Sequence, residues 1–142
     1  MGGQGHRHDR GDSDEGHGYR ERVERSAAAG RKLARHNREL HRSYWKTHDL
    51  AMAEGDLDRK TKELIGLALV VVMQCDVCVS YHVRDCLEAG ATTGEIYDAL
   101  NVAVMQGSGP AMVYAGYAVE ALDEYLADTG ADANTGVDEA DR

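Results

Sequence analysis

The sequence predicts an all-α fold. Proline occurs once among the 142 residues, at Pro110, and no stretch alternates apolar and polar side chains as a half-buried strand would. Residues 1–18 contain Gly, Asp, His and Arg without apolar periodicity, and residues 128–142 are acidic, so both are expected to be disordered tails. A single helical domain is therefore expected over residues 19–127.

We expect about six helices in this domain. The first is expected over residues 19–41, and it can break near His36. The second, shorter helix is expected over residues 43–54. It should end at Gly55, because glycine readily adopts the left-handed conformation that closes a helix.

The next two helices contain the most apolar part of the chain. Asp58 is placed to cap the start of the third helix, which is expected to run to Met73. From Leu64 onward this helix is apolar nearly all round, which predicts that it forms the buried centre of the domain. The fourth helix is expected to begin near Cys75 and to end before Gly90.

A glycine-rich segment separates the last two predicted helices. Thr92 and Glu95 fit a capping box, which should open the fifth helix and carry it to about Met105. Residues 107–110 then interrupt the pattern. Pro110 can start the sixth helix, because its missing N–H costs nothing at the first helical position.

Charge is distributed unevenly along the chain. Residues 20–48 carry 9 basic and 3 acidic side chains, whereas residues 49–142 carry 5 basic and 18 acidic ones. A bulk this acidic repels nucleic acid and anionic lipid, so neither is expected as a partner. No run of about 18 apolar residues is present, and the N-terminus lacks the apolar part of a signal peptide. Because two of the three cysteines form a C-x-x-C pair, which suits a reducing compartment, we expect a cytoplasmic protein.

The most specific pattern is E-x11-C-x2-C-x3-H, formed by Glu63, Cys75, Cys78 and His82. On one helix, the two cysteines and the histidine share a face, because they are three and four residues apart. The helix start favours a thiolate, and His82 can accept the proton of Cys78. If the third and fourth helices form an antiparallel hairpin, Glu63 comes within about one turn of His82 and can orient its imidazole. The pattern therefore predicts a dithiol redox site with its own proton relay.

Other interpretations of these residues stay open. The two cysteines can be core side chains, and Glu63 can be a solvated acid in the first turn of a helix. Cys86 continues the row of Cys78 and His82 and suggests a zinc site. However, residues 75–86 span roughly 16 Å along one helix, too far to surround one metal ion. We therefore interpret Cys86 as a core cysteine and expect no metal or cofactor.

These residues, in this order, resemble the alkylhydroperoxidase D (AhpD) and carboxymuconolactone decarboxylase family. The similarity covers roughly residues 57–126, and includes residues 62–65, the cysteine motif, residues 87–96 and residues 109–111. It implies an AhpD-like helical bundle that assembles into homo-oligomers, often trimers or hexamers. It also implies a thiol-dependent peroxidase or disulfide reductase that acts on a hydroperoxide or a disulfide and is restored by an external reductant.

The resemblance also implies a role for each site residue. Cys78 would attack the peroxide, Cys75 would resolve the product, and Glu63 and His82 would form the proton relay. Peroxidase members often have a histidine just before the second cysteine, where this chain has Val77 and so lacks one relay component. Two alternatives remain: a decarboxylase-like enzyme, although decarboxylating members generally lack the thiols, and a non-catalytic helical assembly module.

Overall fold

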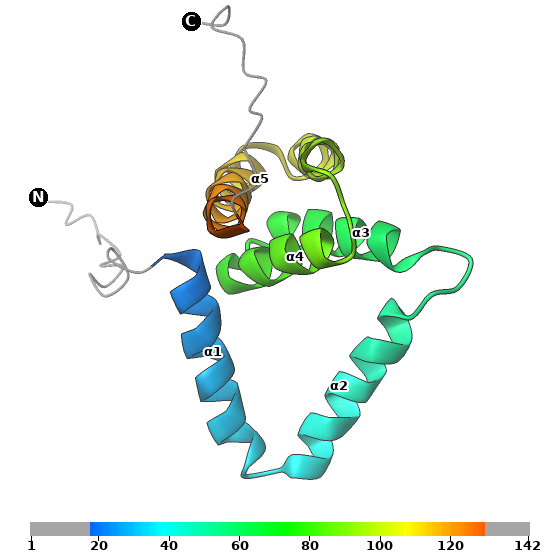
Figure 1. The fold of residues 1–142 in the computed structure, drawn as a ribbon, viewed down its shortest axis with the longest axis vertical. Coiled ribbons are helices and arrows are strands. Elements are labelled where there is room, and N and C mark those ends of the chain that lie inside the picture. The colour runs from blue at the N-terminus through cyan, green and yellow to red at the C-terminus, as the bar shows by residue number, and fades with distance from the viewer. Residues whose placement is uncertain (1–17, 130–142) are drawn as a thin grey trace, which may run out of the picture.

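The computed structural model describes residues 18–129, which form five helices and no strand (Figure 1). The helices are α1 (Tyr19–Ala34), α2 (Arg38–Met52), α3 (Arg59–Val72), α4 (Asp76–Glu88) and α5 (Thr93–Thr129). The predicted all-α class is confirmed for this part of the chain. The two predicted tails fall largely on residues 1–17 and 130–142, which lie outside the described residues.

The helix count is five rather than about six, because the last two predicted helices form one element. The predicted interruption is present as a kink inside α5, where Ser108 has φ 57° and ψ −149°. These angles are not helical, but helix continues on both sides of the kink. Pro110 follows two residues later, where its lack of an N–H does little harm.

The predicted end of the first helix near residue 41 was wrong, whereas the break that the sequence allowed near His36 is present. The first helix ends at Ala34 instead of near residue 41, and the second begins at Arg38 instead of residue 43. The physical reason is a cap: the side chain of Asn37 accepts a hydrogen bond of 3.0 Å from the backbone N–H of Leu40. Such a cap satisfies one of the free N–H groups at a helix start, so the second helix begins directly after Asn37.

Two other predicted caps are present. Asp58 accepts a hydrogen bond of 2.7 Å from the backbone N–H of Thr61. The capping box is reciprocal, since Glu95 accepts from the N–H of Thr92 at 2.8 Å and Thr92 accepts from the N–H of Glu95 at 3.2 Å. Lys60 also donates to Glu95 at 2.6 Å, which lowers the pKa of Glu95 and raises the pKa of Lys60. This contact fixes the start of α3 against the start of α5.

Helices α3, α4 and α5 pack around one hydrophobic core and are called the body here. Its largest fully buried apolar side chains come from all three helices: Leu67, Val71, Val79, Val83, Ile96 and Leu122. Helix α3 is only half buried, however. Leu67 and Val71 lie in the core, whereas Ile65 and Leu69 on the other side are 46% and 56% exposed. The prediction that α3 is the buried centre therefore holds for one of its faces.

Helices α1 and α2, called the arm, stand away from the body as an open V (Figure 1). The start of α1 is attached to α5, because the Glu124 carboxylate accepts hydrogen bonds from the N–H groups of Tyr19 (2.7 Å) and Arg20 (3.2 Å). Gly18 permits this approach, since a Cβ there would lie 2.7 Å from the Oε1 atom of Glu124. Val23 is the only buried residue of α1, and α2 has none.

None of the helices in residues 18–129 is long and apolar enough to cross a membrane.

We predict that Leu67→Ala lowers the free energy of unfolding by about 2–5 kcal/mol, because it leaves a cavity where three helices meet. Leu67 is completely buried in this core. Urea denaturation measures the change, and Leu67→Met is the matched control. It keeps the side-chain volume and should cost less than about 1.5 kcal/mol. Equal losses for the two variants would show that Leu67 is not packed as described.

Candidate dithiol site

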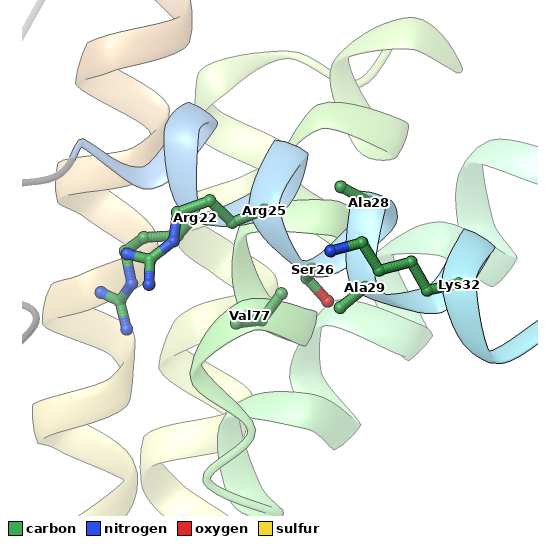
Figure 2. Close-up of a pocket in the computed structure, with 7 residues that line it drawn as sticks. All are labelled: Arg22, Arg25, Ser26, Ala28, Ala29, Lys32 and Val77. Atoms are coloured by element: carbon green, nitrogen blue, oxygen red, sulfur yellow. The ribbon is translucent and has the colours of Figure 1, made fainter.

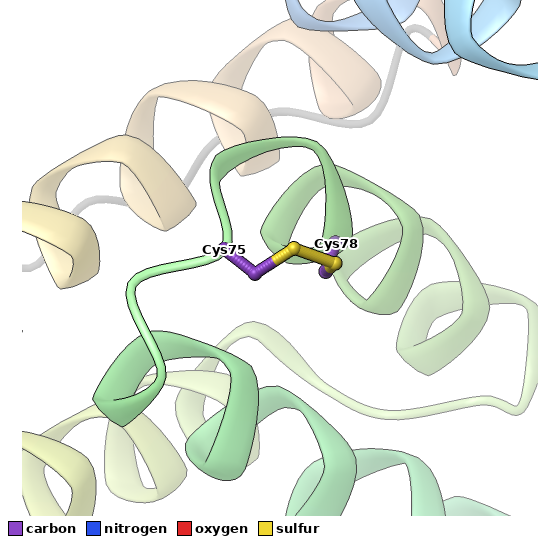
Figure 3. The surroundings of a disulfide bond; sticks show 2 residues. All are labelled: Cys75 and Cys78. Carbon is purple, nitrogen blue, oxygen red and sulfur yellow. A yellow bond between two sulfur atoms is a disulfide. The ribbon is translucent and has the colours of Figure 1, made fainter.

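The two cysteines of the motif lie where α3 turns into α4. The turn is short, because Gln74 adopts a left-handed φ of 58° and the N–H of Cys75 bonds to the carbonyl of Val70 at 3.1 Å. Cys75 is the N-cap residue of α4, and Cys78 lies in its first turn. A disulfide joins the two residues, whose Cα atoms are 5.2 Å apart (Figure 3). Both residues are half-buried, so the pair is accessible from the surface.

The structure brings Glu63 and His82 together across the α3–α4 hairpin. The Nδ1 atom of His82 lies 3.1 Å from the Oε2 atom of Glu63. Glu63 is fully buried, whereas the His82 side chain is 19% exposed. His82 follows Cys78 by one helical turn on α4, which leaves the two side chains on adjacent positions of one face. The antiparallel approach of Glu63 to His82 expected from the sequence is thus present, and the disulfide-bonded pair precedes His82 by one helical turn along α4.

Two further residues shape this cluster, and the sequence analysis missed both. A Cβ at Gly66 would lie 2.8 Å from Cε1 and 2.9 Å from Nδ1 of His82, so the imidazole fits only against a glycine. The Nε atom of Arg59 lies 3.5 Å from the Oε1 atom of Glu63. That oxygen accepts no hydrogen bond from the described residues. The sequence signals for these two residues were a lone glycine in an apolar helix and an arginine four residues before the glutamate of the motif.

Cys86 is buried and free, as expected for a core cysteine. Burial raises the pKa of its thiol to about 12, and the negative charges of Glu63 and Asp85 add to the effect. The thiol is therefore protonated at any physiological pH and is a poor nucleophile. No group of three or more His, Cys, Asp or Glu side chains within the described range is arranged to hold a metal ion.

A basic hollow of about 530 Å³ lies between α1 and the start of α4 (Figure 2). Arg22, Arg25 and Lys32 supply its charge, and Val77, the residue just before Cys78, forms part of its wall. Arg22 is also ion-paired with Asp76, the first residue of α4. The side of the cysteine motif that faces α1 is therefore lined by basic side chains, although the whole chain carries a net charge of −9. The basic composition of residues 20–48 was the sequence signal for it.

These contacts define what the cluster can do. A Cys-x-x-Cys pair at a helix start can pass between dithiol and disulfide with little backbone change. The adjacent imidazole is held by a buried carboxylate through Nδ1, which leaves Nε2 free to accept or return a proton. The arrangement is thus suited to a two-electron thiol reaction coupled to proton transfer.

Several known proteins are similar to this chain. An uncharacterised protein encoded in the cox locus of Paracoccus denitrificans is 39% identical over 75 residues, which cover 53% of this chain and 68% of that protein. An uncharacterised protein of Cupriavidus necator is 36% identical over 73 residues, 51% of this chain and 65% of its own length. This chain therefore spans about two thirds of either relative.

Solved structures show the same fold. The apo form of lpg0406, a carboxymuconolactone decarboxylase family protein from Legionella pneumophila, matches with a TM-score of 0.73 at 33% identity, over 75% of this chain and 96% of that one. A Thermotoga maritima protein of the same family, a candidate for involvement in the antioxidative response, matches with a TM-score of 0.67 at 30% identity, over 78% and 95% of the two chains. The model of the carboxymuconolactone decarboxylase family matches residues 26–124. The chain belongs to the carboxymuconolactone decarboxylase family.

Proposed function

We propose that this protein is a thiol-dependent oxidoreductase that reduces a hydroperoxide or a disulfide with the Cys75–Cys78 pair. One observation carries the proposal: the disulfide lies one helical turn from an imidazole that is held by a fully buried carboxylate. A histidine and a carboxylate in this order activate a thiol in many nucleophilic sites. Two core cysteines would not need such a partner.

The reaction with a hydroperoxide would proceed in two steps from the reduced protein. His82 accepts the proton of Cys78, and the thiolate attacks the terminal peroxide oxygen. An S–O bond forms, the O–O bond breaks, and the leaving alkoxide takes the proton back from His82. Cys75 then gives up its proton, and its thiolate attacks the sulfenic sulfur of Cys78. The S–O bond breaks, and the leaving hydroxide takes up that proton to form water, which gives the disulfide. An external dithiol reductant supplies two electrons and two protons to reopen it.

A disulfide substrate would use the same residues. Cys78 attacks one sulfur of the substrate, a thiol leaves, and Cys75 resolves the mixed disulfide. Val77 occupies the position where many peroxidase members have a histidine, and this loss affects peroxide chemistry more than disulfide exchange. Either reaction needs a steady supply of reductant, which supports a location in the reducing cytoplasm. The possible antioxidative role of the Thermotoga maritima relative supports the peroxide reaction.

Decarboxylation is the alternative that the family name suggests. The paired thiols argue against it, because decarboxylation of a lactone acid gives no role to a dithiol. A purely structural role for the chain is opposed by the buried Glu63–His82 pair, since burying an ionisable pair is costly and seldom stabilises a fold better than apolar side chains would.

The proposal is tested with the two cysteine variants. We expect Cys78→Ser to abolish turnover of hydrogen peroxide or cumene hydroperoxide, because it removes the attacking sulfur. Cys75→Ser should retain one stoichiometric oxidation, to a Cys78 sulfenic acid that a dimedone probe traps and mass spectrometry locates. Trapping in Cys78→Ser but not in Cys75→Ser would reverse the two roles. If neither wild type nor variants consumed peroxide or a disulfide, the proposed function would be wrong.

Thiol counting tests the assignment of the three cysteines. In the oxidised protein at pH 8, we expect no cysteine to react with iodoacetamide while the protein is folded. Mild reduction should expose two reactive thiols, Cys75 and Cys78. Cys86 should react only after denaturation, because its buried thiol stays protonated up to a pKa of about 12. A bridge that includes Cys86, found by peptide mapping, would contradict the assignment.

The fit of His82 against α3 gives a further prediction. We expect Gly66→Ala to slow thiol oxidation by peroxide about tenfold or more, because the new methyl group would displace the imidazole from its position. Stopped-flow measurement of the first oxidation gives the rate. Gly116→Ala is the control, since a Cβ there meets nothing within 4 Å in α5. Equal rates in the two variants would show that the imidazole's position does not matter.

A further inference from the structure

The hollow between α1 and the start of α4 has the size of a small-molecule site and takes no part in the chemistry described above. Its volume of about 530 Å³ lies within the usual range of ligand pockets, roughly 300–1,000 Å³. The described residues that line it include three cationic side chains and no acidic one (Figure 2). A cavity lined by one sign of charge concentrates ligands of the opposite sign, so this hollow favours anions.

The cationic side chains are spread along one face of α1. Arg22, Arg25 and Lys32 follow one another after three and seven residues, and both intervals return to the same face of a helix. Seven residues also place Arg25 and Lys32 about 10 Å apart along the helix. Figure 2 shows both arginines at one end of the hollow and Lys32 at the other. The hollow therefore has two separate positive ends.

Val77 of α4 forms a wall between these positive ends. In Figure 2 it lies between the two arginines on one side and Lys32 on the other, next to Ser26. Val77 directly precedes Cys78, and consecutive Cα atoms are only about 3.8 Å apart. The cysteines themselves do not line the hollow, so a bound ligand reaches the Cys78 sulfur by extending past Val77. The part of the hollow nearest to the dithiol is thus its middle.

The arginines also have contacts within the protein. Both interact with other groups of the chain, and Arg22 is ion-paired with Asp76. A guanidinium group carries five N–H donors, so one carboxylate partner leaves donors for a second. The ion pair holds Arg22 next to α4, and a side chain that is already held loses less freedom when a ligand binds. These contacts are therefore compatible with an anion in the hollow.

We propose that the hollow binds a small disulfide with a carboxylate at each end and presents it to Cys78 as the substrate. The arginines hold one carboxylate and Lys32 holds the other, so that the S–S bond lies against Val77. A symmetrical disulfide has its reactive bond between two equal charges, whereas a hydroperoxide has its reactive group at one end. Two separated cationic ends also suit two carboxylates better than one phosphate, which is bound best where several donors converge. This substrate class rests on the proposed dithiol function.

The reaction oxidises the reduced protein and reduces the bound disulfide. Cys78 gives its proton to His82, and its thiolate attacks one sulfur of the substrate. A new S–S bond forms, the S–S bond of the substrate breaks, and the leaving thiolate takes the proton from His82. Cys75 then gives up its proton, and its thiolate attacks the Cys78 sulfur, so that the second substrate thiolate leaves and takes up that proton. Two electrons pass to the substrate, which departs as two carboxylate-bearing thiols.

Three disulfides of different charge test this substrate class with the reduced full-length protein. They are 3,3′-dithiodipropionate, which is dianionic, bis(2-hydroxyethyl) disulfide, which is neutral, and cystamine, which is dicationic. Quenched-flow and mass spectrometry measure formation of the Cys75–Cys78 disulfide. Each rate constant is divided by that of dithiothreitol with the same disulfide, which corrects for intrinsic reactivity. We expect the corrected rate constant at low salt to be about tenfold or more higher for dithiodipropionate than for the neutral disulfide, and lowest for cystamine.

Salt and matched variants locate the effect. In 1 M KCl the Debye length falls to about 3 Å, so the preference for the dianion should largely disappear. Arg25→Gln with Lys32→Gln removes one cation from each end of the hollow, and should lower the preference about tenfold at low salt. Arg31→Gln with Arg38→Gln removes the same charge from exposed positions outside the lining, and should keep the preference. Circular dichroism checks that both double variants are folded.

Binding without chemistry separates this inference from the proposed function. Suberate resembles dithiodipropionate in length and in its two carboxylates but contains no sulfur, so it can occupy the hollow of the oxidised protein without reacting. We expect suberate to shift the amide NMR signals of Arg25, Ser26, Lys32 and Val77 in wild type. The shifts should be lost in the Arg25→Gln, Lys32→Gln variant. Inorganic phosphate at the same ionic strength should not reproduce them.

Each contrary result has a distinct meaning. Equal corrected rate constants for the three disulfides, or a preference that both double variants lose equally, would overturn the substrate class. Absence of suberate shifts at the hollow of wild type would overturn the binding site. Shifts with phosphate but not with suberate would also overturn it, and would indicate a ligand that carries a phosphate. If suberate bound while no disulfide oxidised the protein, the proposed function would fail and the carboxylate site would stand.

Discussion

The contact between Glu63 and His82 is the constraint on which the arrangement of this molecule depends. A fully buried carboxylate is very costly unless a charged or hydrogen-bonding partner meets it, so α3 and α4 must keep the register that places the imidazole at 3.1 Å. The same register leaves room for the ring only against Gly66. It also sets the short turn at Gln74, and therefore the position of Cys75 at the start of α4.

The hairpin also explains why one cysteine of α4 is placed to react, whereas the other packs in the core. Cys78 and Cys86 lie on the same helix, one turn before and one turn after His82. Cys78 is half-buried in the first turn, where the N–H groups of the helix start can stabilise a thiolate. Cys86 lies deep in the core near the Glu63 charge, and its thiol stays protonated. Burial is the main cause of the raised pKa of Cys86, and the charge of the carboxylate that orients the imidazole adds to it.

Local rules predicted several parts of this structure that depend on neighbours in sequence. The caps at Asp58 and at Thr92–Glu95 and the kink near Pro110 follow from the residues next to them in the chain. The expected end of the second helix at Gly55 was wrong, because α2 ends at Met52 and its C-cap is Ala53 in an extended conformation. A break near His36 was expected, but the start of α2 directly after it was not, because Asn37 was not considered as an N-cap.

Features that need two distant segments were predicted less well. The approach of Glu63 to His82 could be predicted only by assuming that α3 and α4 form an antiparallel hairpin. The requirement for glycine at position 66 could not be predicted, because it depends on the His82 ring that lies against this position in the fold. The attachment of α1 through Glu124, 105 residues from Tyr19 in sequence, had no local signal. Apolar composition likewise could not show that α3 buries only one side, because exposure depends on how many helices surround it.

That half-exposed helix also shows how packing and the candidate site depend on each other. Glu63 and Leu67 face inward from α3, towards His82 and the core, while Leu69 and Met73 are exposed on its other side. Because Glu63 and Leu67 are four residues apart, they lie on the same face of α3. The packing that buries Leu67 between the three helices therefore also keeps the Glu63 carboxylate out of water, and this carboxylate in turn holds the imidazole of His82.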